Sequence, residues 1–128
     1  MKNPTKIAVL ALIKDEDNSK ILGVSRKYDL NDFGLPGGKV DEGEDIYSAM
    51  VREVKEETNL NVINAKPLFF SEVEGSNTHV CVYEVTDYTG FIQITEEGDV
   101  RWVDWDTVKM GTYGDFNEKL HNHILNKN

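Results

Sequence analysis

The sequence predicts an α+β fold in which helices pack on a β-sheet. Two observations support this prediction. Short apolar or alternating segments recur along most of the chain, as strands require, whereas segments 45–59 and 115–126 show a helical repeat. The chain has 128 residues, so we expect a single domain over residues 1–128, large enough to bury a core of its own.

The first third of the chain divides into short segments. Residues 6–14 are mainly a continuous apolar run, which is typical of a buried strand. Acidic residues followed by Asn and Ser predict a turn at 15–19, and residues 20–25 are expected to return as the second strand of a hairpin. We predict a loop at 28–34 and turn residues at 35–40, where Pro and Gly are adjacent.

The remainder of the chain is expected to hold two helices and several strands. The helix at 45–59 is followed by one or two strands within 60–73, where Pro67 marks a bend or an edge. Further along we expect a turn at 74–77 and strands at 78–86, 90–95 and 100–105. The second helix, 115–126, has Asp115 as its candidate N-cap.

The composition argues against several classes of function. The formal net charge is −9, and such an acidic surface repels a nucleic-acid polymer. A small phosphorylated ligand stays possible, because a divalent cation can invert the local charge. No stretch approaches the ~20 apolar residues of a membrane span, and the N-terminal run reads as a strand rather than a signal peptide. Cys81 is the single cysteine, so no internal disulfide can form, and the cytoplasm is the expected compartment.

The helix at 45–59 separates its side chains by chemistry. At ~100° per residue the apolar residues fall on one side, which should pack on the sheet, whereas Glu53, Glu56 and Glu57 fall together on another. Like charges at this spacing repel one another, and a hard divalent cation converts that repulsion into binding. A solvated acidic face is the common explanation for such a helix, so the helix alone does not decide the function.

A longer pattern surrounds these glutamates. From Gly38 the chain reads GKVDEGEDIYSAMVREVKEETNL. This segment resembles the Nudix box: Gly, five residues, Glu, seven residues, Arg-Glu, an aliphatic residue, any residue, Glu-Glu, any residue, Gly and an aliphatic residue. The residues that match it in place are Gly38, Glu44, Arg52, Glu53, Val54, Glu56, Glu57 and Leu60. Asn59 stands where the family usually has Gly, and Asn tolerates the left-handed geometry expected there.

The resemblance implies a fold and a set of roles. The fold is the Nudix-type α/β/α sandwich, with a mixed β-sheet between helices, and the short chain resembles the MutT-like branch. The implied ligands for Mg²⁺ (or Mn²⁺) are Glu53, Glu56, Glu57 and the carbonyl oxygen of Gly38. Arg52 and Glu44 are expected to orient the catalytic carboxylates, with an ordinary surface ion pair as the alternative.

The general base stays open between two positions. The family uses either a helix glutamate, here Glu53, or one from a later loop, here Glu97 with Glu96 beside it; a solvated turn is the alternative for the loop residues. Two residues are candidates for substrate binding. Arg26 could hold a phosphate, with a plain surface role as the alternative, and Asn117 could read a base edge.

The resemblance therefore predicts an enzyme in which water attacks one phosphorus of a nucleoside diphosphate linked to a group X. The expected substrate is a nucleoside triphosphate, with an ordinary or an oxidised base, and the products are a monophosphate and pyrophosphate. Dinucleoside polyphosphates, ADP-ribose and nucleotide sugars are alternatives. A non-catalytic nucleotide-binding regulatory domain and a structural domain without a site are alternatives of other classes. A monomer and a homodimer both fit the sequence.

Overall fold

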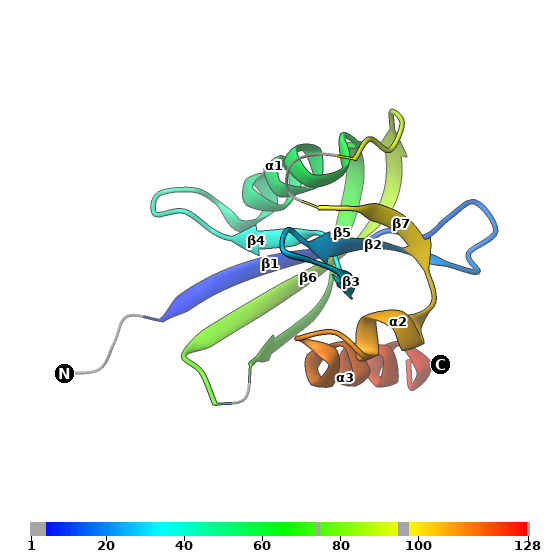
Figure 1. The fold of residues 1–128 in the computed structure, drawn as a ribbon. Coiled ribbons are helices and arrows are strands. Elements are labelled where there is room, and N and C mark those ends of the chain that lie inside the picture. The colour runs from blue at the N-terminus through cyan, green and yellow to red at the C-terminus, as the bar shows by residue number, and fades with distance from the viewer. Residues whose placement is uncertain (1–4, 74, 95–97, 128) are drawn as a thin grey trace.

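The protein folds into three layers, which the computed structural model describes for residues 5–73, 75–94 and 98–127. The strands are β1 (Lys6–Leu12), β2 (Ile21–Arg26), β3 (Asp29–Gly34), β4 (Gly37–Lys39), β5 (Asn61–Glu72), β6 (Thr78–Thr89) and β7 (Val100–Val103). The helices are α1 (Ile46–Thr58), α2 (Trp105–Lys109) and α3 (Gly114–Leu125). Figure 1 shows α1 on one side of the strands and α2 with α3 on the other, which confirms the predicted sandwich.

The strands form two sheets. The larger sheet has the order β4-β1-β6-β5, and it is mixed because β1 and β6 run parallel while the other neighbours run antiparallel. The smaller sheet, β3-β2-β7, is antiparallel throughout. The predicted mixed sheet is therefore confirmed, but the sequence did not reveal that three strands separate from it.

Strand β1 lies inside the larger sheet because both of its faces are apolar. Val9 and Ala11 belong to the core that Met50 of α1 joins, and all three side chains are fully buried. Leu12 belongs to the opposite core, which Leu120 of α3 joins. Burying a side chain of this size contributes roughly 1.5–3 kcal/mol, so β1 helps to hold both helical layers in place.

The predicted hairpin between the first two strands is confirmed at its turn but not along the length of the strands. β1 and β2 belong to different sheets, and the chain crosses between them just beyond β1, where Leu22 N–H donates to Ile13 O at 2.9 Å and Lys14 forms a bridge with Ile21. In the larger sheet β1 pairs with β4 and β6 instead. This central position lets its two apolar faces pack against two separate cores.

Two predicted segments have a different backbone from the one expected. The predicted loop at 28–34 contains the edge strand β3, because pairing with β2 outweighs the turn preference of its Asp and Asn residues. Residues 90–94 form no strand. They run beside the end of α1, where Gln93 N–H donates to Thr58 O at 3.0 Å.

The end of the chain also differs from the prediction. The short helix α2 was not expected, and the candidate N-cap Asp115 is wrong, since Tyr113 holds the N-cap position of α3. Asp115 lies in the first turn of α3 instead, where its charge is favourable to the helix dipole. Gly114 allows the sharp corner between α2 and α3, because a Cβ there would lie 1.9 Å from Lys109 O.

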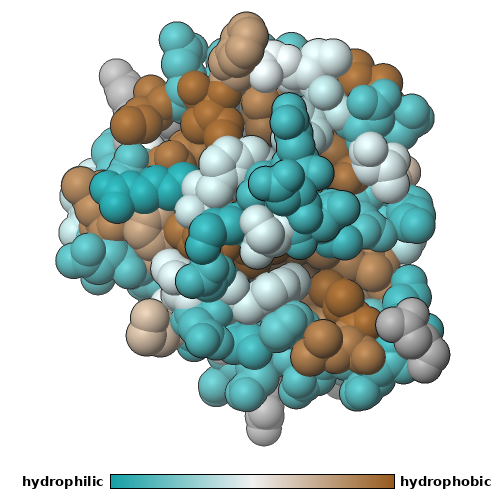
Figure 2. Space-filling model, turned by 90° about the vertical axis from the view of Figure 1, so that its right-hand side faces the viewer, coloured by the Kyte–Doolittle hydropathy of each residue, from teal (hydrophilic) through white to brown (hydrophobic). Residues whose placement is uncertain are grey.

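Several large hydrophobic side chains stay exposed on the surface, among them Tyr28, Phe70, Phe91, Ile94 and Met110. Figure 2 shows one face of the molecule, on which hydrophobic groups are separated by broad hydrophilic areas. Scattered exposed apolar residues are normal, so they identify no partner surface by themselves. In the described part of the chain, the helices are too short or too polar to cross a bilayer.

Candidate active site

Helix α1 is held at both ends, and this fixes the orientation of its glutamates. At its start, Asp45 Oδ1 accepts a hydrogen bond from Ser48 N–H at 2.6 Å. At its end, Asn59 is left-handed with a φ of 72°, and its N–H donates to Lys55 O. Asn59 Nδ2 also donates to Phe91 O at 3.1 Å. The left-handed backbone expected at Asn59 is therefore confirmed.

Arg52 ties α1 to the loop that precedes it. Its Nε and Nη2 donate to the two carboxylate oxygens of Glu44, at 2.8 and 2.9 Å. Glu44 Oε1 also accepts from Asp41 N–H at 3.2 Å, and these hydrogen bonds, those from Arg52 above all, lower the pKa of Glu44 below its ordinary value. This bidentate geometry supports the orienting role expected for both residues.

The same guanidinium also contacts two of the helix glutamates. Arg52 Nη1 lies 2.9 Å from Glu53 Oε1 and 3.3 Å from Glu56 Oε2. The Glu53 side chain is only 16% exposed, whereas that of Glu56 is 54% exposed. Burial raises the pKa of Glu53 above its ordinary value, although Arg52 opposes the shift. Glu53 therefore takes up a proton more readily than a solvent-exposed glutamate does.

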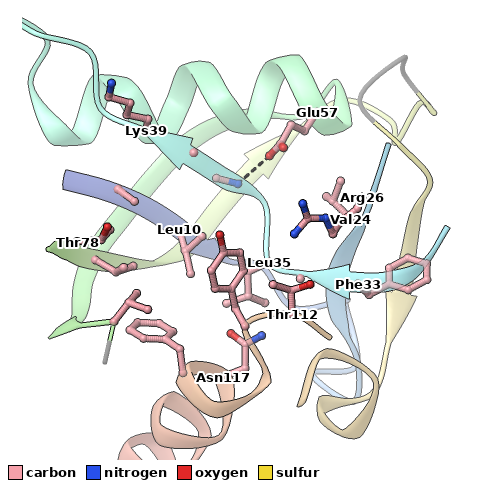
Figure 3. Close-up of a pocket in the computed structure, with 18 of the residues that line it drawn as sticks. Leu10, Val24, Arg26, Phe33, Leu35, Lys39, Glu57, Thr78, Thr112 and Asn117 are labelled. Carbon is pink, nitrogen blue, oxygen red and sulfur yellow. Dashed lines mark hydrogen bonds between the residues drawn. The ribbon is translucent and has the colours of Figure 1, made fainter. Parts of the chain in front are cut away.

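Strand β4 brings backbone groups against the remaining carboxylates. Gly37 N–H donates to Glu57 Oε1 at 2.7 Å, the contact dashed in Figure 3. A Cβ on Gly38 would lie 2.6 Å from Glu53 Cδ, so β4 can approach that carboxylate this closely only with glycine at position 38. The structure therefore brings Gly38, Glu53 and Glu57 to one place, as the sequence pattern predicts.

Among the described residues, no three acidic, His or Cys side chains lie close enough together to hold a metal ion as they stand. Arg52 occupies the space between Glu53 and Glu56, and Glu57 bonds to Gly37. The donor set nevertheless suits a hard divalent cation, since it consists of carboxylate and carbonyl oxygens. A cationic group already lies between two of these carboxylates, so the residues present fit the metal that the resemblance implies.

Beside these glutamates lies a cavity of about 530 Å³. Gly37, Gly38 and Glu57 line one side of it, and Asn117 of α3 lines the other. Figure 3 shows Glu57 and Asn117 on opposite sides, with the apolar side chains of Leu10 and Leu35 between them. The cavity thus has a charged end and an apolar end, and its volume falls within the range usual for small-molecule sites.

Arg26 lines the charged part of this cavity. A register shift between Ser25 and Arg26 interrupts the pairing of β2 with β3, which turns the side chain at this point. The Arg26 side chain is 56% exposed, and its Nε lies 3.9 Å from Asp32 Oδ2. Figure 3 shows it pointing into the cavity, where it is accessible to an anionic ligand.

Asn117 lies at the apolar end and is only 1% exposed. Its Nδ2 donates to Val108 O at 3.0 Å, which fixes the orientation of the amide. Its Oδ1 is buried and accepts no hydrogen bond from any described residue. A buried acceptor without a donor is costly, so this oxygen favours a ligand that presents an N–H or O–H group.

The loop candidate for the general base, Glu97, and its neighbour Glu96 lie outside the described residues. The next acidic residue, Asp99, is described. Its N–H donates to Ser25 Oγ at 2.8 Å, and its carboxylate pairs with Arg101 at 2.6 Å. The first contact ties Asp99 to β2, and the second engages its carboxylate in an ion pair with β7.

Comparison with known proteins identifies the family. The profile described as "NUDIX domain" matches residues 4–123. The chain belongs to the Nudix family. Nudix hydrolases generally use divalent metals, which agrees with the acidic helix of this member.

Two curated Nudix relatives share part of the sequence. A "Putative 8-oxo-dGTP diphosphatase" of Bacillus subtilis (strain 168) is 33% identical over 94 residues, which cover 68% of this chain and 59% of the relative. "Nucleoside diphosphate-linked moiety X motif 6" of Xenopus laevis is 44% identical over 57 residues, which cover 44% of this chain and 26% of the relative. The chain thus spans less than two thirds of either relative.

A solved structure shares the fold more completely. The MutT NUDIX hydrolase from Burkholderia pseudomallei superposes with a TM-score of 0.69 at 25% identity, covering 81% of this chain and 86% of the other. The MutT-like Nudix architecture expected from the sequence is therefore confirmed.

Sequence reasoning missed two residues of this Nudix cavity, Asp32 and Thr112. Asp32 lies in the segment predicted to be a loop, and Thr112 lies in the corner between α2 and α3. They are 80 positions apart and form two hydrogen bonds. No local spacing in the sequence signals such a contact.

Proposed function

We propose that the chain, as a single domain, is a divalent-metal-dependent hydrolase that cuts a phosphoanhydride bond in a nucleoside diphosphate linked to a group X. The substrate that fits best is a nucleoside triphosphate, which would yield a monophosphate and pyrophosphate. Mg²⁺ is the proposed ion, with Mn²⁺ able to replace it.

One observation carries the proposal: the two ends of the cavity match the two ends of a nucleotide. The charged end combines Arg26 with the backbone of β4 and Glu57, as polyphosphate and metal binding would require. The apolar end holds the free Oδ1 of Asn117, which suits an N–H on the edge of a base. An acidic helix without a function would not need an unsatisfied polar atom on the opposite wall.

The residues that would hold the ion are Glu53, Glu56, Glu57 and the carbonyl of Gly38. Bound there, a divalent cation would supply charge neutralisation at the phosphoryl oxygens and acidify a water molecule. The remaining roles belong to side chains of the protein. Arg52 holds Glu44, Glu53 and Glu56 in place, and Arg26 is proposed to donate to phosphate oxygens.

Glu53 is the proposed general base among the described residues. Its carboxylate would accept the proton of the attacking water, and its mostly buried position against Gly38 of β4 holds it in place for this role. Glu97 is the alternative from the loop. The proton acceptor can be assigned by comparing the pH dependence of kcat in the Glu53→Gln and Glu97→Gln variants.

The experiment that tests the function is product analysis by mass on a panel of nucleotides with Mg²⁺. The panel contains nucleoside triphosphates and their oxidised forms, ADP-ribose, dinucleoside polyphosphates and nucleotide sugars. We expect a monophosphate and pyrophosphate from at least one triphosphate, and no product after the metal is chelated.

The matched variants are Glu57→Gln and Glu118→Gln. Glu57→Gln should lower kcat at least about 100-fold, because it removes a charged oxygen donor beside the reacting group, and should leave the circular dichroism spectrum unchanged. Glu118 is exposed on α3, so its variant should keep full activity. Full turnover by Glu57→Gln would disprove the metal-site assignment. Tight nucleotide binding without turnover anywhere on the panel would favour a regulatory binding domain instead.

A further inference from the structure

The corner between α2 and α3, residues 110–113, packs tightly against strand β3. A Cβ on Gly111 would lie 2.4 Å from Phe33 O and 2.6 Å from Asp32 Oδ1. The corner therefore approaches β3 more closely than any side chain at position 111 would permit. Such close approach requires an attraction that holds the two segments together.

The carboxylate of Asp32 supplies that attraction. Its Oδ1 accepts a hydrogen bond from Thr112 N–H at 2.8 Å, and its Oδ2 accepts one from the Thr112 hydroxyl group. The Asp32 side chain is 16% exposed and Thr112 lies at the surface, so the two bonds form at the rim of the cavity. The bonds from Thr112 lower the pKa of Asp32 below its ordinary value, and the side chain is therefore ionised at neutral pH.

The corner leads directly into the apolar end of the cavity. Tyr113, which lines the cavity, is the N-cap residue of α3, and Asn117 follows one turn later. The second oxygen of Asp32 also lies 3.9 Å from Arg26 Nε, on the charged side. Figure 3 shows Thr112 on the cavity wall between Arg26 and Asn117. The Asp32 carboxylate therefore contacts both the α2–α3 corner on the apolar side of the cavity and Arg26 on the charged side.

We propose that Asp32 is a positioning residue: it latches the α2–α3 corner onto β3 and thereby places Asn117 and Arg26 for the substrate. The effect on catalysis rests on the proposed function. Because the latch holds the wall opposite the α1 glutamates, its loss should weaken substrate binding far more than the chemical step.

The test compares Asp32→Ala, Asp32→Asn and Thr112→Val with the control Glu118→Ala, an exposed glutamate on α3 outside the measured segment. Losing two hydrogen bonds to a charged group should raise KM for the nucleotide at least about tenfold in Asp32→Ala, with kcat within about threefold of the wild type. Asp32→Asn can still bond both Thr112 groups and should recover most of the loss. Thr112→Val removes only the hydroxyl bond and should raise KM less than Asp32→Ala does. Combining the two should add nothing to Asp32→Ala, which already removes both bonds.

A second measurement needs no nucleotide. Hydrogen exchange should become at least about tenfold faster at the amides of residues 111–117 in Asp32→Ala, with the amides of α1 unchanged. Unchanged exchange there, or an unchanged KM in Asp32→Ala, would overturn the latch. If the wild type hydrolyses nothing on the panel, the proposed function fails, while the exchange measurement still decides the latch.

Discussion

Replacing Gly38 by Ala tests how closely β4 must approach the catalytic helix. Gly38 lacks the left-handed backbone that disfavours Ala, so the change adds one methyl group without backbone strain. That methyl carbon would lie 2.6 Å from Glu53 Cδ, whereas ordinary van der Waals contact begins at 3.4 Å. The Glu53 carboxylate must therefore move by about 0.8 Å, taken from these two distances.

The expected loss of activity follows from that displacement. Misplacing a reacting group by about 1 Å costs on the order of 100-fold in rate, equivalent to about 2.7 kcal/mol of transition-state stabilisation. We therefore expect kcat/KM of Gly38→Ala to fall about 100-fold with Mg²⁺. The melting temperature should change little, because the Glu53 side chain can turn towards solvent.

The comparison variant is Gly34→Ala in β3, which also lines the cavity. A Cβ there meets no atom within 4 Å, so the same methyl group should displace no carboxylate and should leave kcat unchanged. Both variants are compared by initial rates of pyrophosphate release. Wild-type kcat/KM in Gly38→Ala would refute the argument that the Glu53 carboxylate must stay against β4.

Two further predictions concern stability and pH. Asn59→Ala should lower the free energy of unfolding in urea by about 1–2 kcal/mol, because Ala is strained in the left-handed conformation. Asn59→Gly should come close to the wild type, and equal stabilities of the two variants would contradict the prediction. Burial, with Lys109 nearby, lowers the pKa of His121, which stacks on Trp105 at 4.4 Å. Just below the ordinary His pKa of 6.5, the unfolded chain therefore binds more protons than the folded protein does. The free energy of unfolding should then fall as pH decreases. His121→Phe keeps an aromatic ring on Trp105 and should flatten this slope in urea titrations between pH 5 and 7.

Local sequence was enough to predict helix α1. The caps, the apolar face and the glutamate spacing of α1 all lie within one short segment, and the observed helix differs from the predicted one by a residue at each end. The edge position of β5, with a register shift after Pro67, follows from the same local reasoning. The pairing of β1 could not be predicted in this way, because its parallel partner β6 lies far along the chain, with Lys6 opposite Thr78. Strand β3 was missed although its partner β2 is close in sequence, because its Asp and Asn residues are typical of a loop.

The sequence by itself determined the family, the acidic helix and the residues expected to bind a metal, because these depend on spacing along one helix and the loop before it. The tertiary structure alone decided that Asn117 keeps a free buried oxygen, that β4 approaches Glu53, and that Asp32 reaches Thr112. Those features depend on the packing of segments up to 80 positions apart, and that packing leaves no repeat or spacing in the chain.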